Sequence, residues 1–298
     1  MKLFQKMSNN QARCLLCPRY CELGDGEVGA CHARANYDGE ICPKDYGAIS
    51  ALAISALAVE PIEKKPLTHF LPGTKTLSLG GWGCNLRCVG CENHKISQHS
   101  ISKSESKLDA KQMSPKNIIE IAKEKDCPSI CMTYNEPTIA IEYLLELGKK
   151  CHENDLKFII KTNAYINDEP WEEVCEVVDA MNIDYKGSFE SFEDVTQCRY
   201  KDYGKKILIA YYNDVHIELS IPILPGYSND DGCYFWPLIS LMDGADADDF
   251  KKIPCHLLKI NPAHLMINER TTSDREIAKA KEDLSYIFSE EYIHTSEY

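Results

Sequence analysis

Strand-like and helix-like runs alternate over most of the chain from about residue 75 onward. Six short runs of β-branched or apolar residues have the length and composition of buried strands, and they cover residues 76–80, 129–133, 156–162, 181–185, 215–223 and 256–260. Helical patterns follow at about 114–125, 139–147, 171–178 and 273–287. Such alternation predicts parallel strands joined by crossover connections. We therefore expect an α/β fold, a partial (β/α)6 TIM-like barrel.

The first 45 residues have a different composition, rich in cysteine, glycine and charged residues, with little periodicity. A loop-rich segment of this size buries only a small core and commonly depends on a bound metal. We expect two parts, a small Cys-rich metal-binding module over residues 1–45 and the barrel over residues 46–298.

Composition restricts the compartment and the partners. The 298 residues are 44% hydrophobic, which supports a sizeable core, and the formal net charge of −13 argues against a nucleic-acid partner. No apolar run reaches membrane-spanning length, and the first residues lack the apolar core of a signal peptide. We expect a cytoplasmic protein without membrane contact. In a reducing compartment its 15 cysteines indicate metal sites or catalysis.

Three cysteines, Cys84, Cys88 and Cys91, follow the first predicted strand with the spacing C-x3-C-x2-C. Three thiolates can hold three irons of a [4Fe–4S] cube, because soft sulfur ligands suit iron–sulfur clusters. The fourth iron then keeps an open position at which a substrate can bind. In parallel barrels the working residues lie at the carboxyl ends of strands, which is where this loop is expected.

Two further motifs also follow predicted strands. Asn135-Glu136-Pro137 comes after the second strand, where a carboxylate and backbone carbonyls can accept hydrogen bonds from an ammonium group. The alternative there is an ordinary turn followed by a helix start. Asp184 and Lys186 end the strand at 181–185, where a lysine can meet a carboxylate. A surface ion pair is the alternative at that position.

Four cysteines of the N-terminal module have the spacing C-x2-C-x3-C-x9-C, and they are Cys14, Cys17, Cys21 and Cys31. Four thiolates can bind tetrahedral zinc or a second iron–sulfur cluster. Zinc would be structural, whereas a second cluster would offer an electron route or a substrate anchor. Unligated core cysteines are the third alternative, and Cys42 is a spare candidate ligand.

Five segments, taken together and in order, resemble the AmmeMemoRadiSam branch of the radical S-adenosylmethionine (radical SAM) superfamily. That branch is often described as pyruvate formate-lyase activating enzyme-like, and the resemblance runs from about residue 11 to about residue 288. The segments are Cys14–Pro18, Ile62–Gly73, Gly83–Cys88, Thr133–Thr138 and Ile221–Gly226.

The resemblance implies that Cys84, Cys88 and Cys91 hold a [4Fe–4S] cluster whose open iron SAM chelates. Reduction by a one-electron donor of the flavodoxin or ferredoxin type would release a 5′-deoxyadenosyl radical, under anaerobic conditions, and this radical would abstract hydrogen from a substrate. The protein would position SAM and exclude water. The SAM-contacting residues that the resemblance implies are Asn135, Glu136, Asn163, Asp184, Lys186 and His264.

The resemblance favours a protein substrate, with glycyl-radical activation first and another polypeptide modification second. A small molecule or RNA stays open as the substrate. The competing hypothesis is a Cys-rich iron–sulfur or zinc module that serves redox or binding without SAM chemistry. That hypothesis requires the matches at Asn135-Glu136-Pro137 and at Asp184 and Lys186 to be accidental.

Two segments depart from the family pattern. Lys161 stands where those enzymes have the acid of an Asp-Thr-Asn-Gly segment, and this argues against an acid-dependent role there, such as a cation site. Gly90 precedes the last cysteine of the loop, where an aromatic residue usually helps to seat adenine. We expect Trp82 or Asn93 to rebuild part of that contact.

Overall fold

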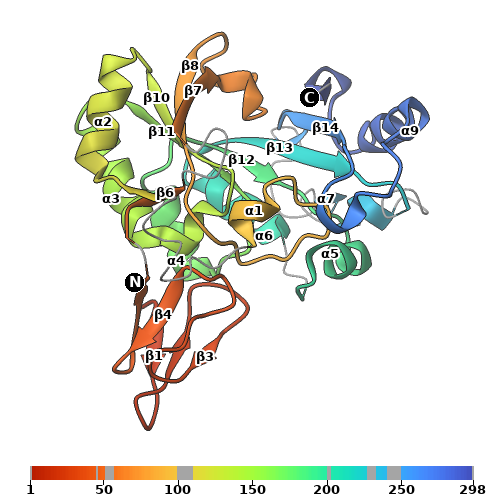
Figure 1. Cartoon of the computed structure of the whole chain (residues 1–298). Coiled ribbons are helices and arrows are strands. Elements are labelled where there is room, and N and C mark those ends of the chain that lie inside the picture. The colour runs from red at the N-terminus through yellow and green to blue at the C-terminus, as the bar shows by residue number, and fades with distance from the viewer. Residues whose placement is uncertain are drawn as a thin grey trace.

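A computed structural model describes residues 2–44, 46–50, 57–98, 110–199, 203–226, 233–239 and 250–296. These residues form a curved eight-stranded sheet with helices packed against it and a small β-rich module formed by the N-terminal residues (Figure 1). The parallel core confirms the predicted partial barrel. The expected boundary between the two parts falls at residue 45, which lies outside the described residues.

The described strands of the sheet have the order β15-β14-β13-β12-β11-β10-β8-β7. Their bounds are β7 Leu57–Pro61, β8 Lys75–Leu79, β10 Ser129–Met132, β11 Lys157–Thr162, β12 Ala180–Asp184, β13 His216–Ile223, β14 Cys255–Lys259 and β15 Ile293–Ser296. Neighbours pair in parallel except β7, which is antiparallel to β8. The six predicted strands are confirmed as β8 and β10 to β14. The sequence missed both edge strands, β7 with the sequence LAVEP and β15 with the sequence IHTS.

The helices of eight or more residues are α2 Pro115–Glu124, α3 Ile141–His152, α4 Asp168–Cys175, α5 Phe189–Thr196, α6 Tyr203–Tyr212 and α9 Asp274–Leu284. Shorter pieces are α1 His94–Ser97, α7 Trp236–Ile239, η1 Ile62–Lys64, η2 Pro137–Ala140, η3 Cys233–Phe235, η5 His264–Met266 and η6 Glu290–Tyr292. Ser114 and Ser273 begin α2 and α9 with capping boxes, because each hydroxyl accepts a hydrogen bond from the backbone N–H three residues later.

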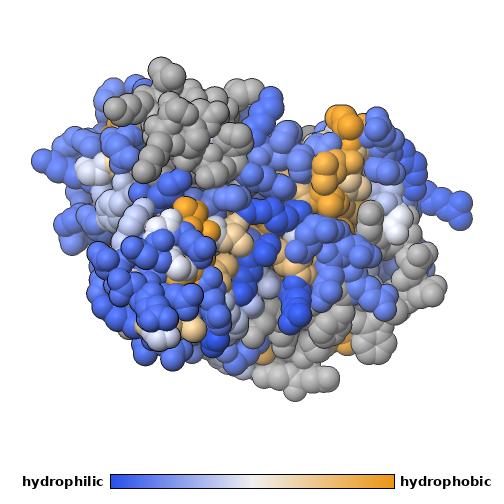
Figure 2. Space-filling model, turned by 60° about the horizontal axis from the view of Figure 1, so that its bottom comes forward, coloured by the Kyte–Doolittle hydropathy of each residue, from blue (hydrophilic) through white to orange (hydrophobic). Residues whose placement is uncertain are grey.

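The core lies between the sheet and its helices. All four residues of β10 are buried, and so are most of those of β11 and β12, because helices and loops cover both faces of a parallel sheet. Figure 1 shows α2 and α3 beside the half of the sheet that contains β10 and β11, and α9 beside β14. Figure 2 shows one face of the molecule, on which hydrophilic residues predominate and apolar side chains gather across the middle.

The amino ends of the strands are closed by a loop that precedes β8. Glu218 of β13 is fully buried there and accepts hydrogen bonds from the backbone N–H groups of Thr68 and His69, at 3.0 and 2.9 Å. Its carboxylate also accepts a bond from His256 Nε2 at 2.7 Å. This network fixes the closing loop, so the chemistry of the barrel must be sought at the opposite, carboxyl ends of the strands.

The N-terminal module contains more strand than its composition indicated. Strands β1 Phe4–Lys6, β2 Ala12–Cys14 and β3 Glu22–Leu23 form an antiparallel sheet, and β4 Arg34–Tyr37 pairs with β5 Glu40–Pro43. Outside the module, β6 Ala48–Ser50 pairs with β9 Ala110–Gln112. Strands of two to four residues are too short for an alternating pattern to be visible in the sequence.

In the part of the chain that is described, no helix has both the length and the apolar character that a membrane span requires.

Candidate active site

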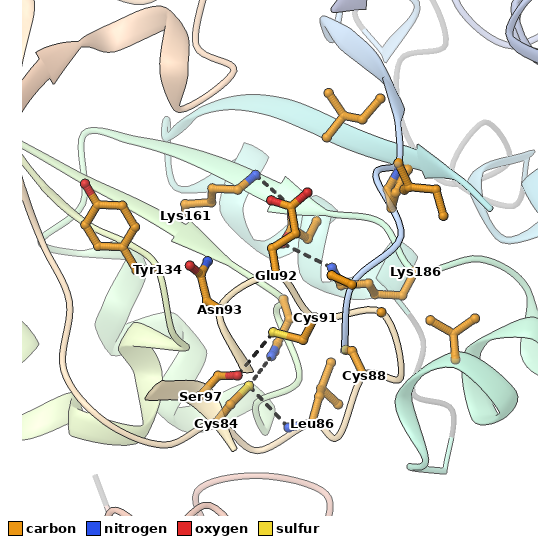
Figure 3. Close-up of a pocket in the computed structure, with 18 of the residues that line it drawn as sticks. Cys84, Leu86, Cys88, Cys91, Glu92, Asn93, Ser97, Tyr134, Lys161 and Lys186 are labelled. Carbon is orange, nitrogen blue, oxygen red and sulfur yellow. Dashed lines mark hydrogen bonds and ion pairs between the residues drawn. The ribbon is translucent and has the colours of Figure 1, made fainter. Parts of the chain in front are cut away.

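The carboxyl ends of the parallel strands surround a cavity of about 380 Å³ (Figure 3). Most of its wall comes from the ends of β8, β10, β11, β12, β13 and β14 and the segments that follow them, and Lys64 and Lys65, which precede β8, also line it. Eight of the predicted site residues line this cavity, and they are Cys84, Cys88, Cys91, Asn135, Glu136, Asn163, Asp184 and Lys186. Segments more than 100 residues apart in the sequence are therefore brought together at the carboxyl ends of the strands, as predicted from the sequence.

The cysteine loop after β8 is held from both sides. Gly83 N donates to Ile96 O at 2.9 Å, and the N–H groups of Arg87 and Val89 donate to carbonyls at the end of α5, each at 2.9 Å. Figure 3 shows Cys84, Cys88 and Cys91 around the same space, with Ser97 beside Cys91. These backbone contacts hold the loop in place, so that its thiols face the cavity.

The three thiols suit a polynuclear iron site. Among the described residues, no three His, Cys, Asp or Glu side chains converge on one point as ligands of a single metal ion do. The cysteines instead surround a cavity, as the ligands of a larger cluster would. Cys84 Sγ accepts contacts from Leu86 N at 3.4 Å and Asn163 Nδ2 at 3.6 Å, and such donors stabilise thiolate sulfur. Burial raises the pKa of all three thiols, while Lys186 acts to lower the pKa of Cys88 and Cys91.

Glu136 is buried and ties two strand ends together. Its carboxylate accepts hydrogen bonds from Thr138 N at 3.1 Å, Thr138 Oγ1 at 2.7 Å, Thr162 Oγ1 at 2.7 Å and Asn163 N at 2.8 Å. Burial raises the pKa of Glu136, although these donors oppose the shift. A carboxylate offers about four acceptor positions, so these contacts occupy most of its capacity and fix the loops after β10 and β11.

Asn135 and Asn163 connect those two loops to the cysteine loop. The side chain of Asn135 accepts from Gly81 N at 3.0 Å and donates to Gly83 O at 3.1 Å. Asn163 Nδ2 lies 3.0 Å from Asn85 Oδ1 in addition to its contact with Cys84. A change at either asparagine would therefore move the cysteine loop as well as the cavity wall.

A third cluster of side chains consists of Lys161, Asp184 and Lys186, at the ends of β11 and β12. Asp184 Oδ1 lies 2.7 Å from Lys161 Nζ, and Oδ2 lies 3.2 Å from Lys186 Nζ. Burial acts to raise the pKa of Asp184, but the two lysines outweigh it and lower the pKa to about 2. Burial lowers the pKa of Lys161, whereas Asp184 outweighs burial at Lys186 and raises its pKa. The sequence singled out Asp184 and Lys186 but treated Lys161 only as a departure.

The region around Gly90 differs from expectation. A Cβ atom on Gly90 would lie 2.9 Å from Met266 Sδ, so the thioether of Met266 occupies the space that a side chain at position 90 would need. Met266, Val195 and Leu224 form a small buried apolar cluster along the cavity. Asn93 also lines the cavity, but Trp82 lines a separate, smaller one. The expected role of Trp82 is therefore not supported, because its side chain packs away from the cavity.

His264 does not line the cavity, although its neighbours Ala263 and Met266 do. Its ring stacks on His94, with 4.6 Å between the ring centroids and an interplanar angle of 17°. The predicted contact between His264 and SAM stays a prediction.

The cysteines of the N-terminal module form a second group. Cys14, Cys17, Cys21 and Cys31 line a small cavity of about 20 Å³, while Cys42 does not. Burial raises the pKa of Cys14, Cys17 and Cys31. Arg34 lines the same cavity and is anchored to Glu142 by two hydrogen bonds of 2.7 and 2.6 Å.

The two cysteine groups are in direct contact through the backbone. Gly83, next to Cys84, packs so closely on the carbonyl of Cys31 that no side chain would fit at that position. The guanidinium of Arg87 donates to the carbonyl of Ala30. The module therefore rests on the cysteine loop of the barrel.

Comparison with known proteins identifies a family and a relative of this chain. The family described as the radical SAM superfamily matches residues 81–232. The "Uncharacterized protein MJ0808" of Methanocaldococcus jannaschii is 31% identical over 292 residues, which cover 96% of this chain and 83% of that protein.

Among solved structures, Streptococcus suis SuiB bound to S-adenosylmethionine matches with a TM-score of 0.51 and 14% identity, over 74% of this chain and 49% of SuiB. SuiB bound to precursor peptide SuiA gives a TM-score of 0.50 and 14% identity, over 74% of this chain and 48% of SuiB. The chain spans about half the length of SuiB, and the likeness is one of fold.

Proposed function

The chain belongs to the radical SAM superfamily, whose chemistry implies a [4Fe–4S] cluster and SAM, and on this premise we propose that it cleaves SAM reductively in the cavity at the strand ends. The observation that carries the proposal is that Cys84, Cys88 and Cys91 line one cavity with the SAM-contact candidates from three other strand ends. We assign the cluster to these three thiols. When bound, it would supply the electron that breaks the sulfonium bond of SAM, and the resulting radical would take a hydrogen atom from the substrate.

The residues around the cavity have separate tasks toward SAM. Lys186 is placed to pair with the carboxylate of SAM, because Asp184 binds it only on one side. Residues 133–135 line the cavity, and we propose that their backbone carbonyls accept the ammonium group, in an arrangement that Glu136 fixes. Asn163 would hold the cysteine loop and SAM in register.

The adenine of SAM would pack against Met266 and its apolar neighbours. Met266 reaches over Gly90 and forms an apolar wall with Val195 and Leu224. A thioether packs favourably on aromatic rings, so it can replace the aromatic side chain that relatives carry at position 90. The same wall would exclude water from the reacting atoms.

The substrate that the observations favour is a polypeptide. Leu265 and Ile267 do not line the cavity, but they are 71% and 64% exposed and are the sequence neighbours of Met266, which does line it, so a peptide that reaches the cavity could pack on them. SuiB is described in complex with its precursor peptide SuiA. The glycyl radical of a partner enzyme, as for pyruvate formate-lyase activating enzymes, is the first specific target to test. A small molecule or RNA is the alternative outcome of that test.

Radical SAM chemistry also needs an electron donor, and a protein of the flavodoxin or ferredoxin type is the proposed one. We assign a second metal site to Cys14, Cys17, Cys21 and Cys31, which share one small cavity directly behind the cysteine loop. Four thiolates can bind zinc or an iron–sulfur cluster. A zinc ion would require these four thiols to move closer together, because no three His, Cys, Asp or Glu side chains of the described residues converge on one point. Iron, sulfide and zinc counts on anaerobic protein separate these alternatives, at about four irons with one zinc or about eight irons.

The proposed function is tested by the product of SAM cleavage. Anaerobically reconstituted and reduced protein given SAM is expected to form 5′-deoxyadenosine, measured by liquid chromatography. The control is the variant that combines Cys84→Ala, Cys88→Ala and Cys91→Ala, which should give only background. Product at background level in the wild type, with the cluster present and with candidate peptides added, would contradict the proposal.

A further inference from the structure

The ammonium group of Lys161 lies in a cage of three oxygen atoms. Its Nζ is 2.7 Å from Asn182 Oδ1, 2.7 Å from Asp184 Oδ1 and 3.1 Å from Ser220 Oγ. An ammonium has three N–H donors, so each donor has one acceptor. This saturated geometry leaves no lone pair for nucleophilic chemistry and points to an electrostatic role.

The cage is built by the sheet and does not depend on the lysine. Asn182 Nδ2 donates to Pro66 O at 2.9 Å, which turns Oδ1 of the amide toward Lys161. Ser220 donates its hydroxyl to Asn182 Oδ1 at 2.7 Å and keeps its lone pairs for the lysine. Both residues are fully buried on neighbouring strands, where Asp184 also pairs with Ser220 in the β12–β13 register. The oxygens would therefore stay in place without the lysine, and oxygen is the ligand atom that hard cations prefer.

The position of Lys161 also decides the charge that Lys186 presents. Asp184 divides its carboxylate between the two lysines, one oxygen to each. The three groups carry one net positive charge, and Lys186 is the member expected to meet the carboxylate of SAM. Without Lys161, Asp184 alone would neutralise Lys186, and the attraction for an anionic group would be lost.

We propose that Lys161 is a tethered monovalent cation, which fills the Asn182–Asp184–Ser220 cage and leaves Lys186 positively charged toward the carboxylate of SAM. Lys161 thus acts as a positioning residue through Asp184. The inference rests on the proposed function, because it takes SAM as the ligand of Lys186. It implies that the protein needs no free monovalent cation for SAM binding, and that removing the lysine creates a cation site.

Two variants separate this role from simple packing. Lys161→Ala leaves the oxygen cage open to a small cation such as potassium or ammonium. Lys161→Met fills nearly the same space with an apolar chain and leaves no room for an ion. Both variants remove the charge, so only the cation-binding hypothesis expects them to respond differently to added salt.

The experiment measures the dissociation constant of SAM by anaerobic equilibrium dialysis of reconstituted protein. The buffer contains choline as its only cation, and potassium, ammonium or further choline chloride is added at equal ionic strength. We expect less than about a twofold change for the wild type and binding weaker by about tenfold or more for Lys161→Ala in choline. Potassium or ammonium should restore that variant to within about threefold of the wild type and leave Lys161→Met weak.

The inference would be overturned by a wild type that needs potassium to bind SAM. It would also be overturned by a Lys161→Ala variant that binds SAM normally in choline, or that neither potassium nor ammonium restores. Equal restoration of SAM binding in Lys161→Met would contradict it as well. Melting temperatures of the same proteins need no SAM. If potassium or ammonium raises the melting temperature of Lys161→Ala alone, the cation site is supported even if this variant folds poorly in choline. The absence of such a selective rise would overturn the cation site. A wild type that binds no SAM contradicts the proposed function instead, and the melting series still decides the cation site.

Discussion

The two cysteine groups have the same ligand chemistry but opposite surroundings. Cys84, Cys88 and Cys91 line a cavity of about 380 Å³ that also contains the charged side chains of Lys161, Asp184 and Lys186. The four cysteines of the N-terminal module line a small space of about 20 Å³. In the proposed assignment, three ligands around an open cavity leave a coordination position for a reactant, whereas four ligands around a small one would complete the coordination of their metal.

Under the proposed function, this difference places the reaction at the barrel cysteines and a supporting role at the module cysteines. Charged side chains such as Lys161, Asp184 and Lys186, which could orient an amino acid, line the barrel cavity. Among the described residues that line the module cavity, the charged ones are Arg19 and Arg34. Arg34 is anchored to Glu142, and Arg19 donates to the carbonyl of Asn85, so both arginines join the module to the barrel. The module therefore braces the loop that carries the reactive site.

The largest effect is expected from a substitution that disrupts only the barrel cysteine site, the open site formed by Cys84, Cys88 and Cys91. Cys84→Ala should strongly lower 5′-deoxyadenosine formation, because the cluster loses a ligand. Substitutions of residues that contact a metal ligand usually lower activity by about 10- to 100-fold, and the loss of the ligand itself should lower it further. The measurement is product per iron–sulfur cluster under anaerobic conditions. Cys151→Ala is the matched control, since Cys151 is a buried thiol of α3 that lines neither cavity. Equal activity of Cys84→Ala and the control would remove Cys84 from the site.

The next change tests the cysteine site of the module. Cys17→Ser should lower the melting temperature by more than about 5 °C, because the module loses a metal ligand and part of the brace on the cysteine loop. Metal content should fall by the ions of one site. Cys42→Ser provides the control, as Cys42 does not line the thiol cavity. Unchanged metal content in Cys17→Ser would favour unligated core cysteines.

The fold and the open site were largely accessible from the sequence. Strand-length apolar runs such as Ile130–Met132 predicted buried parallel strands because both faces of such a sheet are covered. The rule that working residues follow strands then brought Asn135, Asp184 and Cys84 to one cavity. These predictions succeeded because they depend on local patterns and on a general property of parallel sheets.

What the sequence missed depends on contacts between distant segments. Met266 lies 176 positions after Gly90, and nothing in either segment shows that the thioether fills the space above the glycine. Lys161 was treated as a loss of an acid, whereas its role follows from oxygens on two neighbouring strands. The short strands of the module were hidden for the same reason, since their pairing and not their composition defines them.

A third prediction concerns the rigidity of the open site. Glu136→Gln should weaken SAM binding by about 10-fold or more, because an amide replaces one acceptor oxygen with a donor in a buried network of four donors. Binding is measured by anaerobic equilibrium dialysis. Glu120→Gln, on the exposed face of α2, should bind SAM as the wild type does. Normal binding by Glu136→Gln would mean that the loops keep their positions without this carboxylate.

A fourth prediction tests the apolar wall by exchange of two residues. Gly90→Phe alone should weaken SAM binding, because the new side chain meets Met266. Met266→Ala alone should weaken it less, by a few-fold, through loss of packing on adenine. The double variant should bind better than Gly90→Phe, with a coupling of about 0.5–3 kcal/mol between the two positions. Additive effects in this cycle would show that Met266 and the residue at position 90 do not share one space.

The smallest expected effect is a pH dependence that only the open site should show. Burial lowers the pKa of Lys161, so its positive charge is lost as pH rises through a value below the ordinary lysine pKa of about 10.4. The groups that act on it are Asp184, Lys186 and Cys131, and the pKa of Lys186 is raised, so Lys186 keeps its charge over that interval. Wild-type SAM affinity should therefore fall a few-fold between pH 8 and pH 10, measured by equilibrium dialysis, while metal content stays constant. Lys161→Ala in potassium has no proton to lose at this position and should show a flatter profile. Parallel profiles for the two proteins would assign the alkaline loss to another group.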